Sequence, residues 1–162
     1  MRTPNFIIIG AMKSATSTLY EQLRLQPGIY LPDLKEPNFF SDDIQYAKGE
    51  SWYLDLFAAA AQDDIVGEAS THYTKLPTYP ETVARLKTHV PDARLIYIMR
   101  HPVDRLISHF VHDWTERKIT VGIDDAVVMH RDLVEYGRYA MQLRPFIEAF
   151  GRDRIMPIFF EH

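Results

Sequence analysis

A lysine and four hydroxyl side chains directly follow the first apolar segment of the chain, Phe6–Ile9. Gly10 permits a tight turn there, and the residues after it are typical of a helix start, where backbone N–H groups lack intrahelical acceptors. A cation beside such groups makes a cradle for an anion, best suited to a phosphate. A capped helix with a solvated lysine is the alternative reading. The cradle would comprise Lys13, Ser14, Ala15, Thr16, Ser17 and Thr18.

A second basic position follows another apolar run. Arg100 comes directly after Leu95–Met99, and Ser108 lies about two turns into the helix predicted after Pro102. A guanidinium at a strand end with a nearby hydroxyl can hold a phosphate by charge-assisted hydrogen bonds. Taken alone, Arg100 would be a surface ion pair and Ser108 a solvated helix position. We predict that Arg105 is structural and pairs with a nearby carboxylate.

Short apolar runs and helical periodicities alternate along the chain. The runs are rich in Ile, Val and aromatic residues, which predicts strands buried on both faces. The expected strands are Phe6–Ile9, Ile65–Val66, Leu95–Met99 and Ile155–Phe160. The expected helices are Thr82–Val90, Tyr139–Phe150 and the segment after Pro102, with an apolar stripe of Val103, Leu106, Ile107, Phe110, Val111 and Trp114.

This alternation predicts a parallel α/β sheet with right-handed crossovers. In such sheets ligands bind at the carboxyl ends of the strands, here after Ile9, Glu68 and Met99. A further loop and helix normally follow a strand such as Ile155–Phe160. We therefore expect residues 1–162 to be a single domain that lacks its C-terminal portion.

Composition excludes several classes of protein. The chain has 162 residues, a formal net charge of −4 and no cysteine. Disulfide frameworks, thiolate metal sites and cysteine nucleophiles are therefore excluded, and the acidic balance argues against a nucleic-acid partner. Phe6–Ile9 is too short for a spanning helix or a signal peptide, so we expect no membrane span and a cytoplasmic location.

The first loop differs from the ATP-binding P-loop, G-x-x-x-x-G-K-[ST]. Counted from Gly10, that motif requires glycine and lysine where this chain has Ala15 and Thr16. The run Leu95–Met99 also ends in a basic residue rather than in an aspartate that would hold magnesium. A nucleotide or metabolite kinase therefore remains only an alternative.

Four segments resemble sulfotransferases that use 3′-phosphoadenylyl sulfate (PAPS). Lys13–Leu19 is similar to their K-[ST]-G-T-[ST]-x-L loop, with Ala15 in place of the usual glycine. Lys35–Phe40 resembles the K-E-P-x-F-F stretch of the bacterial and heparan-type branch, and Gly67–Tyr73 its G-E-x-[ST]-x-x-Y segment. Arg100–Ser108 matches the R-x-P-x-x-R-x-x-S signature.

The resemblance implies a three-layer α/β fold like that of P-loop NTPases and a PAPS-dependent transfer of a sulfuryl group to a hydroxyl or amine. It implies that the Lys13–Thr18 loop binds the 5′-phosphosulfate, and that Arg100 and Ser108 bind the 3′-phosphate. Lys13 would also stabilise the leaving group, and no metal is required. The acceptor would be a small molecule or a glycan, and the sequence does not predict the oligomeric state.

The resemblance places the catalytic base on Glu36, with His72 as its rival. A glutamate walled by Phe39 and Phe40 would have its pKa raised towards the working pH. Glu68 is expected to be structural. The heparan modifiers carry a lysine after this glutamate, where this chain has Ala69.

Two further groups of residues, a histidine pair and an aromatic cluster, each allow a functional or a structural role. His109 and His112 lie on one helix, where we expect solvated side chains rather than a metal site. Trp52, Tyr53 and Phe57 would line an acceptor pocket or pack in the core. An incomplete nucleotide-binding fragment without activity is the remaining alternative.

Overall fold

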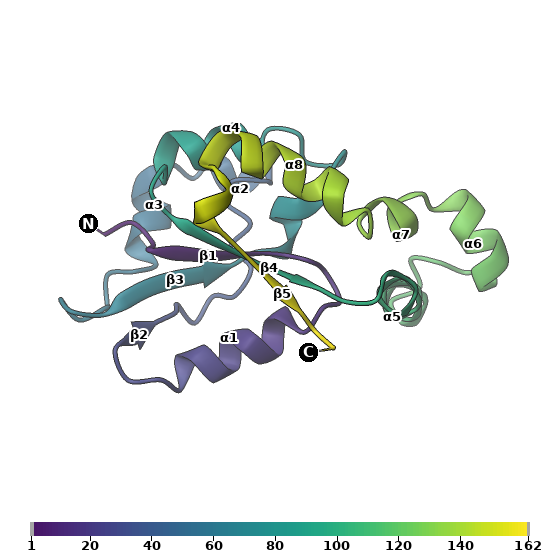
Figure 1. The fold of residues 1–162 in the computed structure, drawn as a ribbon, viewed down its shortest axis with the longest axis horizontal. Coiled ribbons are helices and arrows are strands. Elements are labelled where there is room, and N and C mark those ends of the chain that lie inside the picture. The colour runs from purple at the N-terminus through teal and green to yellow at the C-terminus, as the bar shows by residue number, and fades with distance from the viewer. Residues whose placement is uncertain (1, 162) are drawn as a thin grey trace.

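The computed structural model of the chain describes residues 2–161, which form a five-stranded parallel sheet (Figure 1). The strand order is β2-β3-β1-β4-β5. The bounds are β1 Phe6–Gly10, β2 Ile29–Tyr30, β3 Ile65–Ala69, β4 Arg94–Met99 and β5 Ile155–Phe159. The four predicted strands are therefore present, and the short β2 is an addition at one edge.

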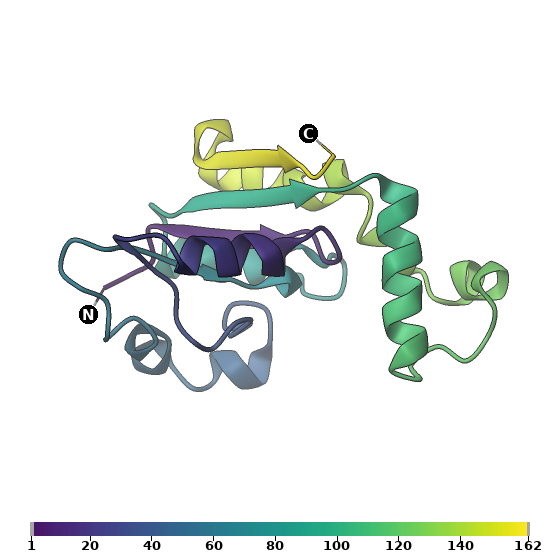
Figure 2. The ribbon, with the colours of Figure 1, turned by 90° about the horizontal axis from the view of Figure 1, so that it is seen from below.

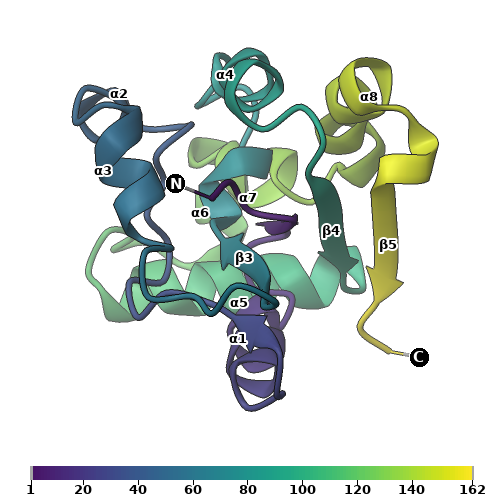
Figure 3. The same cartoon turned by 90° about the vertical axis from the view of Figure 1, so that its left-hand side faces the viewer.

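Helices cover both faces of this sheet, which makes the predicted three-layer α/β fold (Figure 3). Helices α4 and α8 lie on one face and α1 lies on the other. The helix bounds are α1 Thr16–Arg24, α2 Asp43–Tyr46, α3 Glu50–Asp55, α4 Thr82–His89, α5 Pro102–Thr115, α6 Ile123–Met129, α7 Asp132–Glu135 and α8 Tyr139–Phe150, with 3₁₀ turns η1 Thr71–Thr74 and η2 Arg152–Arg154.

Strand β1 contributes to the two larger hydrophobic clusters of residues 2–161. All five of its residues are buried, and they point alternately to the two faces of the sheet. Ile7 packs in the larger cluster, with Leu86 of α4 and Phe146 of α8, while Ile8 packs in the smaller cluster with Tyr20 of α1. This packing fixes the carboxyl end of β1, where the predicted anion loop begins.

Strand β5 differs from its prediction. We expected it to be buried on both faces, but it pairs only with β4 and forms the edge of the described sheet. Met156 is 58% and Phe159 54% exposed. Apolar side chains alone do not distinguish a central strand from an edge strand, which is why the sequence pattern was misleading here.

Helix α5 also differs, because its apolar stripe is largely exposed. Val103 and Trp114 are each 56% exposed, whereas Arg105, His109 and Asp113 are buried on the opposite side. The helix runs across the carboxyl ends of the strands instead of lying on a face of the sheet (Figure 2). Its buried side therefore meets α7, and the half-buried Leu106 and Phe110 pack against a small apolar cluster of Ile119, Ala126 and Leu133.

Candidate functional site

A cavity of about 660 Å³ lies at the carboxyl ends of the central strands. The anion loop after β1, the turn after β3 and helix α5 after β4 all contribute to its wall. It brings together every predicted site residue except Ser14, namely Lys13, Ala15, Thr16, Ser17, Thr18, Glu36, His72, Arg100 and Ser108. Segments that are far apart in the sequence thus form one site.

The loop after β1 has the backbone of an anion cradle. Lys13 and Ala15 have positive φ values of 68° and 61°, a conformation that turns backbone N–H groups into a shared concavity. A Cβ on Gly10 would stand 2.0 Å from Oγ1 of Thr74, so only glycine fits there. Ala15 adopts the left-handed conformation expected of the usual glycine, at a cost of about 1–2 kcal/mol.

Ser14 does not line the cavity. Its side chain is fully buried, and its hydroxyl has no hydrogen-bond partner within residues 2–161. An unpartnered buried hydroxyl is unfavourable in itself. The structure does not bring Ser14 to the cavity with the other residues predicted for the anion loop.

Hydrogen bonds to the backbone of Arg100 fix this residue, and its guanidinium forms no ion pair with residues 2–161. The phenol of Tyr139 accepts from the Arg100 N–H at 3.2 Å and donates to its carbonyl at 2.7 Å. Nη1 donates to the carbonyl of Lys13 at 3.5 Å, and the guanidinium lies 5.3 Å from the Phe160 ring centroid. Among residues 2–161 Arg100 forms no ion pair, so its charge can meet an anion.

Glu36 faces the same cavity as an ionised carboxylate. It accepts from Nζ of Lys35 at 2.8 Å and from Oγ1 of Thr71 at 3.1 and 3.2 Å. Burial alone would raise the pKa of Glu36, but the bond and charge of Lys35, with Thr71 and Lys75, outweigh it and lower the pKa. The predicted upward shift was therefore wrong.

The aromatic residues after Glu36 explain the error. Phe39 and Phe40 are fully buried and turn into the core, where Phe39 stacks on Tyr53 at 4.8 Å. They cannot wall the carboxylate. Tyr53 and Phe57 are core residues as well, so they line no acceptor pocket.

His72 lies in η1 and lines the same cavity as Glu36, but its side chain is neutral where that of Glu36 is charged. Its ring stacks on Tyr79 with a centroid distance of 4.9 Å, and its Nδ1 is buried without a partner in the described chain. Burial and then the charge of Lys75 lower the pKa of His72 to about 4, so the imidazole is neutral at pH 7. Both predicted bases are thus in their proton-accepting forms.

Glu68 lies in the core next to the cavity, and its carboxyl group links the residues of the turn after β3 to α3. The carboxylate is fully buried and accepts from Tyr73 at 2.8 Å, Ser70 at 2.9 Å and Tyr53 at 3.1 Å. The Ser70 hydroxyl also accepts from the backbone of Asn38 at 3.1 Å, next to the Glu36 turn. Its position agrees with the structural role predicted for it.

Glu68 makes folding stability depend on pH. Burial raises the pKa of Glu68 to about 7 despite those hydrogen bonds, whereas the unfolded carboxyl titrates near 4.3. The folded state therefore holds the proton more tightly, and this stabilisation is lost as the pH rises through 7. We expect a fall of about 3 kcal/mol in the free energy of unfolding between pH 4.5 and 7 from this group.

Urea denaturation of the Glu68→Gln variant at several pH values measures that contribution. The variant should lose this part of the pH dependence, while Glu148→Gln, at an exposed position of α8, should keep it. An unchanged slope in Glu68→Gln would show that the Glu68 carboxyl stays ionised in the folded chain.

Several residues of the cavity were missed by the sequence analysis. Thr71, Lys75 and Lys118 line it, together with Met12, His112 and Phe160. Thr71 and Lys75 follow β3 by two and six residues. They therefore lie at the carboxyl ends of the parallel strands, where ligands bind in such sheets. Their place at the end of a predicted strand was therefore the available signal.

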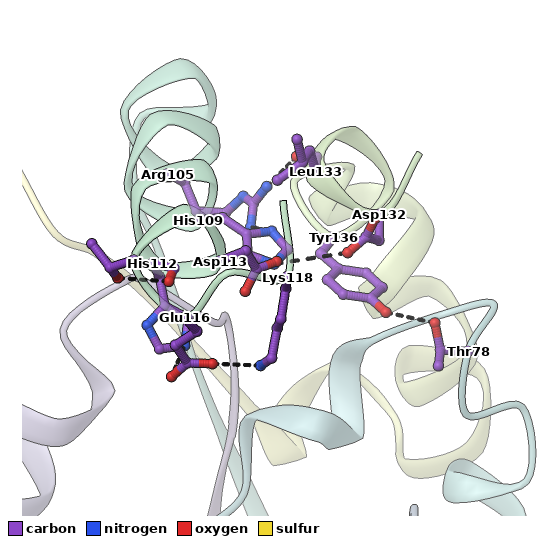
Figure 4. Close-up of polar contacts among 11 residues, drawn as sticks. Thr78, Arg105, His109, His112, Asp113, Glu116, Lys118, Asp132, Leu133 and Tyr136 are labelled. Atoms are coloured by element: carbon purple, nitrogen blue, oxygen red, sulfur yellow. Dashed lines mark hydrogen bonds and ion pairs between the residues drawn. The ribbon is translucent and has the colours of Figure 1, made fainter. Parts of the chain in front are cut away.

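Polar side chains join α5 to α7 behind the cavity (Figure 4). Arg105 donates to the carbonyl of Leu133, and its Nη1 lies 3.5 Å from Nδ1 of His109. Arg105 is therefore structural, as predicted, but its hydrogen bonds go to a carbonyl and an imidazole instead of a carboxylate. His109 was expected to be solvated and is buried.

The same cluster brings His109, Asp113 and Asp132 within reach of one ion. An arginine only donates, so Nδ1 of His109 accepts and its Nε2 carries the proton towards Asp113, 3.1 Å away. A metal at Nε2 would force the proton onto Nδ1, against the guanidinium. The geometry disfavours a metal at this position.

Fold and site together define an α/β protein with a cavity at the carboxyl ends of its strands, lined by the loop after β1 and by Arg100 and Ser108. The sequence model of the sulfotransferase family matches residues 39–162. The chain belongs to the sulfotransferase family. Within residues 2–161, no helix is both long and apolar enough to cross a membrane.

Relatives of known name agree with this assignment. Mouse heparan sulfate glucosamine 3-O-sulfotransferase 3A1 is 31% identical over 94% of this chain and 40% of its own length. Membrane-associated sulfotransferase kil1 of Dictyostelium discoideum is 36% identical over 70% of this chain and 24% of its own. The chain thus spans well under half of these relatives.

A solved structure is similar over nearly the whole chain. The crystal structure of a sulfotransferase from Alicyclobacillus acidocaldarius aligns with a TM-score of 0.84 and 30% identity. The alignment covers 99% of this chain and 74% of that one. The predicted sulfotransferase-type fold is therefore confirmed.

Proposed function

We propose that the chain transfers a sulfuryl group from PAPS to a hydroxyl or amine. The observation that carries this proposal is the single cavity that unites the loop after β1, Arg100 with Ser108, and the carboxylate of Glu36. The first two supply separate positions for two anionic groups of one donor. We assign the third, the carboxylate of Glu36, to removal of the acceptor proton.

The residues of the cavity suggest a division of labour. Glu36 takes the acceptor proton as the acceptor oxygen or nitrogen bonds to sulfur. A carboxylate with a lowered pKa is a weak base, but that proton becomes strongly acidic as the new bond forms. Lys13 and the backbone N–H groups stabilise the charge that gathers on the leaving phosphate oxygen. The chain's own groups thus perform the reaction without a metal.

The acceptor is proposed only as a class. The mouse relative is named for heparan sulfate glucosamine, so a glycan is one candidate and a small molecule is the other. Ala69 stands where the heparan modifiers carry a lysine, so the acceptor side differs from theirs. The cytoplasmic location stays a prediction, and the kinase alternative loses its support with the family assignment.

The role of Arg100 can be tested by binding alone. Arg100→Ala should weaken PAP, the desulfonated product, by about 1.5–3 kcal/mol, because a charge-assisted contact to the 3′-phosphate is lost. AMP lacks that phosphate and should bind the variant and the parent almost equally. Isothermal titration of both ligands decides the matter. Equal losses for PAP and AMP would mean that Arg100 only supports the fold.

A further inference from the structure

Lys75 presents a mostly buried positive charge to the cavity without a partner. It follows η1 directly, and its Nζ lies 5.7 Å from the ring centroid of Tyr136. Within residues 2–161 this ammonium takes part in no hydrogen bond or ion pair, whereas Nζ of Lys118 lies 2.6 Å from Glu116. Removing a charge from water without pairing it is costly. Such a group is expected where an anion arrives.

The residues around Lys75 indicate which anionic group of the donor it would contact. Thr71 and His72 of the same turn line the cavity with it, and Glu36 accepts from Thr71. Lys75 and Glu36 line the same cavity, and the charge of each shifts the pKa of the other. Lys75 therefore belongs, with Thr71, His72 and Glu36, to the part of the cavity lining that holds both predicted bases, where the proposed function puts the acceptor.

We propose that Lys75 binds the non-bridging oxygens of the sulfuryl group during its transfer. This assignment rests on the proposed function. The acceptor oxygen forms a bond to sulfur and gives its proton to Glu36, while the bridging S–O bond breaks and its electron pair stays on the phosphate of PAP. Lys13 neutralises that phosphate, and Lys75 keeps its own proton throughout. Lys13 would thus bind the leaving phosphate, and Lys75 would bind the sulfuryl group that departs from it.

The surroundings of Lys75 predict how this contact responds to pH. Burial, together with the charge of Lys118, lowers the pKa of Lys75 to about 8. The charges of Glu36, Asp113 and Asp132 raise the pKa of Lys75. The side chains of Tyr136 and His72, which lie beside Lys75, are neutral at pH 7. In the free protein the ammonium is therefore lost as the pH rises through 8, and the affinity for PAPS should fall with it.

Titration calorimetry with PAPS and PAP tests the assignment without an acceptor. Lys75→Met should weaken PAPS about 10- to 100-fold, since a charge-assisted contact is lost, and leave PAP within about threefold. Lys75→Arg should retain most of the PAPS affinity and keep it above pH 8. The matched control is Lys87→Met, because Lys87 also lies over an aromatic ring, 5.0 Å from Phe150, but outside the cavity.

The outcomes separate this proposal from the proposed function. If Lys75→Met weakens PAPS and PAP equally, or neither, Lys75 does not contact the sulfuryl group. If Lys75→Arg binds as poorly as Lys75→Met at every pH, a cation is not what the position supplies. If the parent chain binds neither PAPS nor PAP, the proposed function fails, and the role of Lys75 fails with it.

Discussion

Replacing Lys13 by alanine should lower turnover by about 2.7–4 kcal/mol in activation free energy, which is roughly 100- to 1,000-fold. The expected loss is that of one preorganised donor at an atom where negative charge develops, here the leaving phosphate oxygen. PAP should bind almost as before, because the backbone N–H groups of the loop remain. Turnover is measured as PAP released from PAPS with an acceptor found by screening.

Lys13→Arg is the informative companion variant. The planar guanidinium cannot place its charge where the compact ammonium sits, so it should restore turnover only in part. Normal turnover of Lys13→Ala would make Lys13 a solvated side chain beside a capped helix. The proposed stabilisation of the leaving group would then be wrong.

Replacing Glu36 by glutamine should reduce turnover by about 100-fold or more, with PAP affinity nearly constant. Glutamine keeps the shape of the side chain and removes the proton acceptor. Because the pKa of Glu36 is lowered, the parent should stay active as the pH falls towards 4.5 and lose activity only below it. The pH profile and the variant therefore test the same group independently.

His72→Ala is the control for this assignment. It removes the rival base and its stacking on Tyr79, and it should retain most of the turnover. If instead His72→Ala is inactive and Glu36→Gln turns over normally, the base is His72. The neutral imidazole found in the structure would then be the acceptor of the proton.

The central strands could be predicted because their signal is local. Phe6–Ile9 and Leu95–Met99 are short apolar runs, and the structure pairs the segments that contain them in the parallel sheet. The side that α5 buries could not be predicted, because it depends on where the helix lies. Periodicity assumes that the apolar side meets the core, but α5 crosses the strand ends and buries Arg105 instead.

The motifs predicted which candidate residues would lie together, but they did not predict the direction of the Glu36 pKa shift. Lys13, Arg100 and Glu36 meet in one cavity as expected. The pKa of Glu36 is lowered first by the adjacent Lys35 and then by Thr71, 35 residues away, and Phe39 turns into the core instead of walling the carboxylate. Tertiary contacts of this kind are not encoded in the spacing of a short motif.

Calorimetric titration of the unaltered chain with PAP and with AMP tests whether the cavity is a site for the sulfuryl donor. If Arg100 and Ser108 hold the 3′-phosphate, PAP should bind at least about tenfold more tightly than AMP, as one charge-assisted contact provides. The comparison requires neither a known acceptor nor a metal. Equal affinities for the two nucleotides, or no binding of PAP, would contradict a site built for the sulfuryl donor.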